Sequence, residues 1–391
     1  MSDIQGIILV VDDNEMNRDM LSRRLARRKH TVITAKNGQE ALDLIGKKSF
    51  DVIILDVMMP GISGIEVLKI LRESFSATDL PIIMATAKSE SEDIVEALKL
   101  GANDYVTKPL NFPVVLARVG TQLSLKNSQD ALKSAHDRMK LDLDAAAQIQ
   151  QTLLPYNLPE IDPFVIDWKF YPCDELAGDF LNIFQLNENE IGIYIVDVMG
   201  HGVPAALLSF SVSRNLFPLA GTDSIVLNSG DTPGVVSPAE VLTKLNTLYP
   251  FQTNKDRFFT ILYGVLDIRN GQFRYSSAGH PGPLIISSDK SVKEIRSAGF
   301  PIGIVGEPDY KETTITLDPG DRMYLYSDGF IEERNKDGDL FDINQLQESI
   351  KRNYPLTLVK SLENTVNAIM AWHGSEHLSD DLSIIGIEMK R

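Results

Sequence analysis

Five short apolar runs, separated by helical patterns, fill roughly the first 120 residues of the chain. The runs are IILVV, TVITA, DVIIL, PIIMAT and DYVT, and helical segments such as EMNRDMLSRRLARR and QEALDLIGK lie between them. The run FDVIILD has no alternation of apolar and polar residues, which is typical of a strand buried on both faces. Strands that alternate with helices over short connections predict a doubly wound α/β domain with five parallel strands.

A different pattern occupies residues 112–154, where the β signals vanish. Apolar residues recur there at spacings of three, four or seven, which predicts one long helix ended by Pro155 and Pro159. These apolar residues are Leu125, Leu132, Ala135, Met139, Ala146, Ile149 and Leu153. Because Ser128 and Asp142 occupy two of the seam positions, the pattern fits a short coiled coil and a solitary amphipathic helix on a flanking domain equally well.

After this helix, strand-like runs return in another rhythm. Runs such as FVIDWKFYP, EIGIYIVDV, FFTILYGVLDI and LSIIGIEM are joined by turn signals such as NENE, RNG and SDKS, which indicates antiparallel pairing. Helical patterns lie among them at PAALLSFSVSRNLF, PAEVLTKLNTLY and PLTLVKSLENTVNAIMAW. This arrangement predicts an α+β domain, and the stretch AGTDSIVLNSGDTPGVVS predicts a long loop within it.

Composition narrows the classes of function open to such a chain. Asp and Glu number 54 against 38 Lys and Arg, the net charge is -16, and we find no basic stripe, which argues against a DNA-binding regulator. The single cysteine, Cys173, excludes an internal disulfide and fits a reducing compartment. The sequence shows no signal-peptide pattern and no uninterrupted apolar run of about 18 residues. We therefore expect a cytoplasmic protein that contacts neither nucleic acid nor membrane.

Acidic residues end the first and third of the predicted parallel strands. The run ILVVDD delivers Asp12 and Asp13, and FDVIILD delivers Asp56. In open α/β sheets the ligand crevice lies outside the carboxyl ends of the strands, so these carboxylates are expected to meet. They would repel one another without a cation between them, and oxygen ligands favour magnesium. Thr86 and Lys108 end two further strands and would complete a seat for a phosphoryl group, with Asp56 as the nucleophile.

The stretches VVDDNEMNR, ILDVMMPGISG, ATA and YVTKP together resemble the receiver domain of two-component response regulators, over roughly residues 5–125. The resemblance implies a flavodoxin-like fold, phosphorylation of Asp56, a cis bond between Lys108 and Pro109, and a histidine kinase or phosphotransfer protein as partner. It also implies two sets of residues, which are the Mg²⁺ ligands Asp12, Asp13, Asp56 and the Met58 carbonyl, and the catalytic and switch residues Thr86, Tyr105 and Lys108.

A second set of aspartates lies at strand ends in the last part of the chain. Its members are Asp179 in LAGDFLNIF, Asp197 in IGIYIVDVMGHG, Asp328 in LYSDG, and Asp380 and Asp381 in LSDDLSII. Scattered carboxylates without a nearby cysteine or paired-histidine spacing favour magnesium or manganese over zinc. Two such ions can bind a phosphate ester and activate water for in-line attack. Spacing alone supports this interpretation and ordinary turn aspartates about equally.

The motifs AGDF, VDVMGHGVPAALL, SSAGHPGPLI, GFPIGI, LYSDGFIEERNKDGDLF and SDDLSIIGIEM resemble the metal-dependent serine/threonine phosphatases of the stage-II-sporulation and stress-response group, a bacterial branch of the PPM fold. The resemblance covers roughly residues 160–391, and AAQIQQTLLPYNLP resembles the helical lead-in of that group. It implies an antiparallel β-sandwich flanked by helices, with two Mn²⁺ or Mg²⁺ ions. The implied ligands are Asp179, Asp197, the Val198 carbonyl, Asp328 and Asp380, with Asp381 as a neighbour or alternate ligand. Asn182 stands where many members carry a second acidic residue, a departure that bears on an accessory metal position.

Two histidines, His201 and His280, raise the alternative of a Ser/His/Asp triad with Ser276 or Ser277. Both lie in stretches, GHG and GHPGP, that are typical of tight loops, and no GxSxG pattern precedes a helix. We therefore expect both histidines to support the fold or the site from outside it.

Together these patterns predict a receiver domain at residues 1–124, a helical or coiled-coil linker at 125–158 and a phosphatase domain at 159–391. The predicted function is a response regulator whose phosphorylation at Asp56 controls a metal-dependent phosphoprotein phosphatase. The resemblance implies a phosphorylated anti-sigma-factor antagonist as substrate, and the linker pattern suggests a homodimer. The alternative is an adaptor, in which a receiver is joined to an inactive phosphatase-like domain that binds a sigma factor or another partner.

Overall fold

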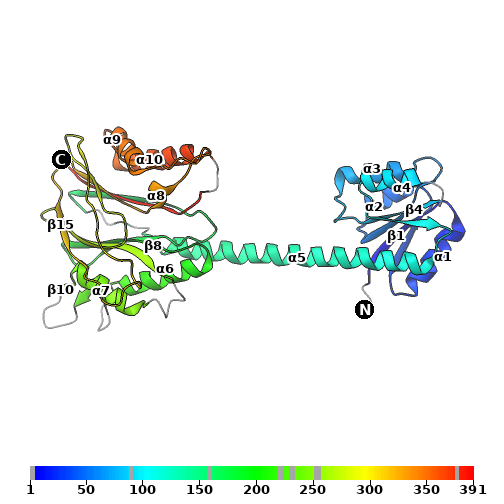
Figure 1. The fold of residues 1–391 in the computed structure, drawn as a ribbon, viewed down its shortest axis with the longest axis horizontal. Coiled ribbons are helices and arrows are strands. Elements are labelled where there is room, and N and C mark those ends of the chain that lie inside the picture. Colours follow the sequence, from blue (N-terminus) through cyan, green and yellow to red (C-terminus); the bar gives the residue numbers. More distant parts are fainter. Residues whose placement is uncertain are drawn as a thin grey trace. The chain divides into compact units, whose positions relative to one another are not determined.

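The first part of the chain folds around a five-stranded parallel sheet. The computed structural model describes residues 5–87, 91–155, 158, 161–218, 224–228, 234–250, 257–374 and 378–391. The chain divides into two compact units, Met1–Lys140 and Leu141–Arg391. The strands of the first unit are β1 (Ile7–Val11), β2 (Thr31–Ala35), β3 (Val52–Asp56), β4 (Ile82–Ala87) and β5 (Asp104–Lys108). Their order is β2-β1-β3-β4-β5 with every pair parallel, which confirms the predicted doubly wound sheet (Figure 1).

Helices cover both faces of this sheet. They are α1 (Glu15–Ala26), α2 (Gly38–Ile45), α3 (Gly64–Ser74), α4 (Ser91–Lys99) and the first turns of α5 (Phe112–Thr152). Leu21 and Leu25 of α1 share a buried cluster with Val115 and Val119 of α5 on one face. Residues of α2, α3 and α4 form a second cluster on the opposite face. Strand β3 is buried along its whole length, as its unbroken apolar pattern predicts.

Helix α5 runs without a break for 41 residues, so the prediction of one long helix is confirmed. It ends at Thr152, and Pro159 lies outside the described residues. Because its first turns pack on the parallel sheet, the last helix of the first unit and the linker are a single element. Beyond those turns it exposes large apolar side chains, which are Leu125, Leu132, Met139, Leu141 and Ile149. The boundaries at residues 124 and 158 remain predictions.

The second unit contains two five-stranded antiparallel sheets. The first has the order β15-β12-β11-β8-β7 and the second β14-β13-β16-β17-β6. The bounds of these strands are β6 (Phe164–Tyr171), β7 (Phe180–Gln185), β8 (Glu190–Val198), β11 (Phe259–Asp267), β12 (Gln272–Ala278), β13 (Leu284–Ile286), β14 (Val292–Glu294), β15 (Thr313–Thr316), β16 (Arg322–Tyr326) and β17 (Leu382–Met389). The predicted antiparallel pairing is therefore confirmed.

Helices lie outside both sheets, which gives four layers (Figure 1). The helices are α6 (Val203–Leu216), α7 (Pro238–Leu248), α8 (Gly329–Glu332), α9 (Ile343–Asn353) and α10 (Leu358–His373). Helices α6 and α7 contact the first sheet, whereas α9 and α10 contact the second. One buried cluster contains residues of both sheets together with residues of α6 and α7, and Phe180, Ile195, Ile261, Leu325 and Ile385 belong to it. The α+β prediction is confirmed.

Some short elements were absent from the sequence prediction. Within residues 220–237, which we predicted as a loop, β9 (Leu227–Asn228) pairs with β10 (Gly234–Val235), and much of the remainder lies outside the described residues. Strand β14 and helices α8 and α9 were also missed. Two- to four-residue elements carry too little periodicity to detect, and α9 has a polar sequence whose apolar residues are few.

The antiparallel pairing brings four strand ends to one edge of the sandwich. Strand β8 ends where its neighbour β7 begins, since Phe180 pairs with Val196. Strand β16 likewise ends where β17 begins, since Tyr326 pairs with Ile384. An antiparallel pair places the end of one strand beside the start of the next. Residues that flank these four ends therefore come from distant parts of the sequence but gather at one edge of each sheet.

No described helix is both long enough and apolar enough to span a membrane.

Candidate functional site

The first unit gathers three carboxylates at the carboxyl edge of its parallel sheet. Oxygen atoms of Asp12, Asp13 and Asp56 lie within 4.8 Å of one another. The Lys108 Nζ atom lies 2.6 Å from Asp56 Oδ2 and 3.0 Å from Asp12 Oδ2. Thr86, at the end of β4, is 2% exposed. All five strand-end residues singled out in the sequence therefore occupy the same edge of the sheet, with side chains from β1, β3 and β5 in contact.

Backbone and amide groups orient Asp12 within this cluster. The Asn14 backbone N–H donates to Asp12 Oδ1 at 2.8 Å, and Asn17 Nδ2 lies 3.1 Å from Asp12 Oδ2. Close approach of α3 constrains Asp56, because a Cβ atom at Gly64 would lie 2.0 Å from the Asp56 carbonyl oxygen. Both carboxylates are therefore held in place before any ligand binds.

Burial and the lysine act in opposite directions on the charge of Asp56. Burial raises the pKa of the Asp56 carboxyl above its usual value, and this outweighs the lowering effect of its hydrogen bond to Lys108. Burial lowers the pKa of Lys108, but its hydrogen bonds to Asp56 and Asp12 outweigh burial and leave the pKa raised. The ammonium group therefore stays charged and supports ionised carboxylates in a buried site.

The remaining receiver residues surround this cluster. The Met58 backbone N–H lies 3.4 Å from Asp56 Oδ1, and the Met58 side chain is 63% exposed. Tyr105 is partly buried against the cluster formed with α2, α3 and α4. The peptide bond between Lys108 and Pro109 is cis, as the receiver resemblance implied.

The second unit has a cleft of about 310 Å³ at the edge where the four strand ends gather. Its lining residues are Cys173, Asp197, Val198, Met199, Gly200, His201, Phe258, Thr260, Asp328, Ser379 and Asp380. The cleft thus brings together Asp197 at the end of β8, Asp328 just after β16 and Asp380 just before β17. These three aspartates are distant in sequence, and all were predicted as metal ligands.

Two further predicted residues, Asp179 and Asp381, are buried beside the cleft. The carboxylate of Asp381 accepts hydrogen bonds from the backbone N–H groups of Cys173, Gly178 and Asp179, at 2.7 to 3.1 Å. Asp381 therefore ties together the chain segments that precede β7. The Asp179 carboxyl is 2% exposed, and its Oδ2 atom has no hydrogen-bond partner among the described residues.

The carboxyl groups of this site raise one another's pKa. Burial raises the pKa of Asp179 well above its usual range, and the charges of Asp197 and Asp381 add to this effect. Burial, together with Asp328 and Asp380, raises the pKa of Asp197 to about 8. Burial and the neighbouring Asp380 raise the pKa of Asp328 to about 6. The cluster is thus an arrangement of negative groups that is unfavourable without a compensating cation.

These observations fit the binding of divalent metal ions. A buried carboxylate oxygen without a hydrogen-bond partner is costly, and coordination to a cation would satisfy it. Hard, oxygen-rich ligand sets suit Mg²⁺ or Mn²⁺. Among the described residues, oxygen or sulfur atoms of Cys173, Asp380 and Asp381 also lie within 4.8 Å of one another. Burial and the nearby Asp381 raise the pKa of the Cys173 thiol, which disfavours a thiolate ligand.

Thr260, which we did not single out in the sequence, supports Asp197 from the neighbouring strand. The β8–β11 register places it opposite Asp197, and its hydroxyl lies 3.4 Å from Asp197 Oδ2. The same hydroxyl lies 2.9 Å from His280 Nδ1. His280 is 2% exposed, and burial lowers its pKa to about 3, so its ring is neutral. His280 therefore orients Thr260 from behind the cleft, in the supporting role expected for it.

The arrangement does not form a serine triad. Ser276 Oγ donates to the Lys311 carbonyl, and Ser277 Oγ donates to the carbonyl of His280 rather than to its ring. His201 lines the cleft, so the prediction that it lies outside the site is wrong, and its Nδ1 lies 2.6 Å from Asp174 Oδ2. Asn182 Nδ2 lies 3.5 Å from the Leu153 carbonyl, and Asn182 does not line the cleft.

A contact between buried Glu333 and partly buried His373 was also missed by sequence analysis. Glu333 is 1% exposed and lies 2.5 Å from His373 Nδ1, and it accepts the backbone N–H of Ser379 at 3.1 Å. The pair fixes the segment that precedes Asp380. No spacing signal links residues from two helix ends, so only the folded chain shows this contact.

With the fold and both sites defined, comparison with known proteins identifies the family. The model of the Stage II sporulation protein E (SpoIIE) family matches residues 187–390, which is more than half of the chain. The response regulator receiver domain model matches residues 8–120. The chain therefore belongs to the SpoIIE family and combines a phosphatase domain of that family with a receiver domain.

Individual relatives agree with this division. The chain is 28% identical over 260 residues to phosphoserine phosphatase RsbU of Bacillus subtilis, covering 66% of this chain and 73% of that protein. It is 41% identical over 119 residues to the uncharacterized transcriptional regulatory protein YkoG of Bacillus subtilis, covering 30% of this chain and 51% of that one. The solved SiaA-PP2C domain of Pseudomonas aeruginosa has a TM-score of 0.54 at 22% identity, covering 65% of this chain and 98% of that domain, which shows a shared fold.

The raised pKa of Asp197 predicts how the metal-free second unit responds to pH. The pKa of Asp197 is about 8 in the folded chain, above the usual value of about 4 for an unfolded chain. The folded state therefore favours the neutral carboxyl group, and the free energy of unfolding should fall as pH rises from about 4 to about 8. In the presence of chelator, Asp197→Asn should therefore be more stable than the parent at pH 8.5, by at least about 1 kcal/mol, and this difference should shrink towards pH 5. Urea unfolding followed by fluorescence reports this unit, because both tryptophans, Trp168 and Trp372, belong to it.

Asp309→Asn is the matched control, because the Asp309 side chain is 84% exposed. It should follow the parent at every pH. A difference between parent and Asp197→Asn that stays constant between pH 5 and 8.5 would contradict the prediction.

Proposed function

We propose that this chain is a response regulator in which phosphorylation of Asp56 controls a metal-dependent phosphoprotein phosphatase. The observation that carries the proposal is the convergence of Asp197, Asp328 and Asp380 in one cleft, beside the unpartnered carboxylate oxygen of Asp179. Membership of the SpoIIE family and the receiver match support the same combination of activities.

In the receiver, Asp56 is the proposed nucleophile. A carboxylate oxygen of Asp56 attacks the phosphorus of a phosphohistidine on a histidine kinase or phosphotransfer protein, the P–N bond breaks, and an acyl phosphate forms. Asp12 and Asp13, with Asp56 and the Met58 carbonyl, would hold Mg²⁺, which offsets the charge of the phosphoryl oxygens. Lys108, which contacts Asp56 and Asp12, would stabilise the same charge, and Thr86 and Tyr105 respond to the phosphoryl group as the switch.

In the phosphatase unit, the proposed ligands of two Mn²⁺ or Mg²⁺ ions are Asp179, Asp197, the Val198 carbonyl, Asp328 and Asp380, with Asp381 as their support. Such ions, when bound, would hold the phosphate ester and activate the attacking water. The chain itself orients the ligands through Thr260 and the Asp381 backbone contacts. The mouth of the cleft includes the exposed residues Met199, His201 and Asp380, which leaves room for a phosphorylated side chain on another protein.

The proposed substrate is a phosphoserine or phosphothreonine on an anti-sigma-factor antagonist. The similarity to a phosphoserine phosphatase supports the phosphoserine part, and the family resemblance supports the partner-switching role. The adaptor alternative would be favoured by loss of the metal carboxylates, and all of them are retained. We therefore propose the phosphatase function rather than the adaptor function.

The catalytic proposal predicts manganese-dependent hydrolysis of an aryl phosphate by the purified chain. Asp197→Asn should lower kcat/KM by at least about 100-fold, because it removes a carboxylate that both faces the cleft and lies beside Asp328 and Asp380. Steady-state kinetics with and without chelator measure this. Asp309→Asn should retain full activity. An inactive parent that folds normally but binds no manganese by calorimetry would favour the adaptor.

The regulatory proposal predicts that beryllofluoride, a phosphoryl mimic, changes the phosphatase rate of the parent chain. The reason is that one unbroken helix, α5, ends the receiver that contains Asp56 and also leads into the second unit. Asp56→Asn should abolish the response while leaving the basal rate unchanged. The direction of the response in the parent gives the sign of control. Equal rates with and without beryllofluoride would refute regulation through Asp56.

Self-association through α5 is part of the proposal. Leu125, Leu132 and Met139 recur at seven-residue spacing, and their side chains are 57%, 71% and 58% exposed. Apolar residues at this spacing on exposed helices favour pairing with a second copy of the same helix.

Self-association predicts that Leu132→Lys will shift the chain from dimer to monomer, because it places a charge in the seam of the paired helices. Sedimentation velocity over a range of protein concentrations measures this shift. Ser134→Lys, which adds the same charge at an exposed position outside the seam, should remain dimeric. A parent chain that is monomeric at all concentrations would rule out the dimer.

A further inference from the structure

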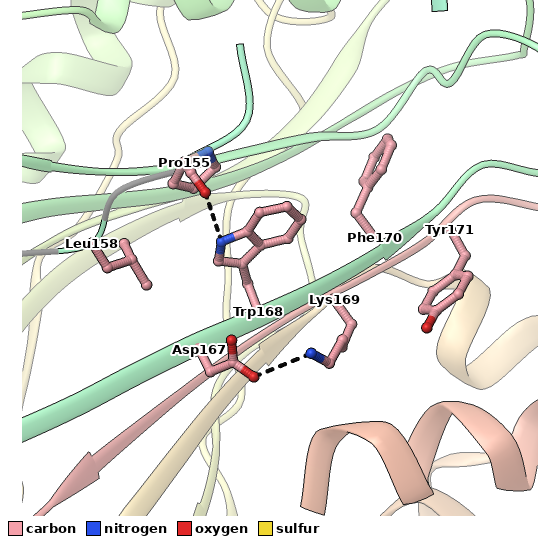
Figure 2. A pocket seen from close by; sticks show the side chains of 7 residues that line it. All are labelled: Pro155, Leu158, Asp167, Trp168, Lys169, Phe170 and Tyr171. Atoms are coloured by element: carbon pink, nitrogen blue, oxygen red, sulfur yellow. Dashed lines mark hydrogen bonds and ion pairs between the residues drawn. The ribbon is translucent and has the colours of Figure 1, made fainter. Parts of the chain in front are cut away.

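The end of helix α5 is anchored within the second unit. Leu154, just after the helix, is 5% exposed and belongs to the buried cluster that contains residues of both sheets, and Leu153 packs against that cluster. The Trp168 indole Nε1 donates to the Pro155 carbonyl at 3.0 Å beside a hollow on edge strand β6, as Figure 2 shows. The last turn of α5 therefore has a fixed position on the sandwich.

Gln150, in this last part of α5, pairs with the backbone of Ala177. Its side-chain Nε2 donates to the Ala177 carbonyl at 2.9 Å, and its Oε1 accepts the Ala177 N–H at 3.2 Å. Ala177 is fully buried, so both of its backbone groups need partners. A primary amide can satisfy the donor and the acceptor of one residue together, which an aliphatic or carboxylate side chain cannot do.

Ala177 belongs to the turn that delivers Asp179 to the metal site. The next two residues, Gly178 and Asp179, donate their N–H groups to Asp381. The turn also lies against the end of β8, because a Cβ atom at Gly178 would lie 2.9 Å from the Val198 carbonyl oxygen. The turn is thus held by Asp381, by the end of β8 and by Gln150.

We propose that Gln150 is a positioning residue through which the linker helix holds Asp179 in place to bind metal. This inference rests on the proposed phosphatase function and names the residue that connects the linker to its metal site. Gln150 does not touch substrate or the reacting atoms, and it acts through the Ala177 backbone. Any movement of the last turn of α5 would be transmitted by two hydrogen bonds to the turn that carries Asp179.

Replacing Gln150 should weaken metal binding by about tenfold or more, as loss of supporting hydrogen bonds around metal ligands generally does. Gln150→Ala removes both hydrogen bonds, whereas Gln150→Glu keeps the length of the side chain and removes only the donor. Gln151→Ala is the matched control, because Gln151 is the next residue and is exposed. Calorimetric titration of the full chain with Mn²⁺ measures affinity without depending on activity. The isotherm of Asp197→Asn identifies the heat that belongs to the receiver.

The expected result is weaker Mn²⁺ binding by both Gln150 variants, unchanged binding by Gln151→Ala, and a higher Mn²⁺ concentration for half-maximal aryl phosphatase activity with little change in substrate KM. Mn²⁺ affinity within about twofold of the parent overturns the inference. A Gln150 variant that unfolds at a lower temperature in chelator but keeps the Mn²⁺ affinity of the parent also overturns the inference, because that result shows a purely structural role.

The experiments distinguish failure of the proposed phosphatase function from failure of the proposed role of Gln150. A parent chain that binds Mn²⁺ in the second unit but hydrolyses no phosphate ester overturns the phosphatase function alone, and the affinity comparison still decides the role of Gln150. A parent in which Asp197→Asn changes no Mn²⁺ heat overturns both, because there is then no metal site for Gln150 to position.

Discussion

Repulsion between buried carboxylates is the constraint on which both sites depend. Each unit brings acidic side chains together at strand ends, and the repulsion between their charges opposes folding. In the first unit a lysine relieves part of the repulsion, since Lys108 contacts both Asp56 and Asp12. In the second unit the pKa of Asp197 rises to about 8, although the Thr260 hydroxyl lies near its carboxylate and backbone N–H groups donate to Asp381. A bound cation would offset this repulsion, which is why both arrangements suit divalent metal ions.

Two aspartates in similar sequence settings, ILDVMMPG and YIVDVMGHG, differ in their surroundings because their sheets differ. Asp56 ends a central strand of a parallel sheet, so its neighbours are the ends of other parallel strands, and one of these supplies Lys108. Asp197 ends a strand of an antiparallel sheet, where its register partner on β11 is Thr260. The first setting suits a carboxylate that accepts a phosphoryl group, and the second suits a carboxylate that holds a metal ion.

Much of the fold could be predicted from the spacing of apolar residues in the sequence. The unbroken apolar run at β3 and the heptad spacing along α5 each specify local geometry, so strand burial and helix continuity were predictable. The strand-end aspartates were predictable for the same reason, because a carboxylate that follows an apolar run must emerge at a sheet edge. Sequence patterns did not reveal Thr260, the Glu333–His373 pair or the hydrogen bonds of Gln150 to Ala177. Each depends on a contact between segments that share no periodicity.

The sequence by itself determined the two kinds of sheet, the long helix between them and the residues that can carry charge or metal. These properties depend on periodicity and on side-chain chemistry, both of which are local. Only the tertiary structure decided which aspartates share a cleft, which buried carboxylate oxygen has no hydrogen-bond partner among the described residues, and which residue joins the linker helix to the turn bearing Asp179. Those outcomes depend on strand register and close packing, which place residues distant in the chain within a few ångströms of one another.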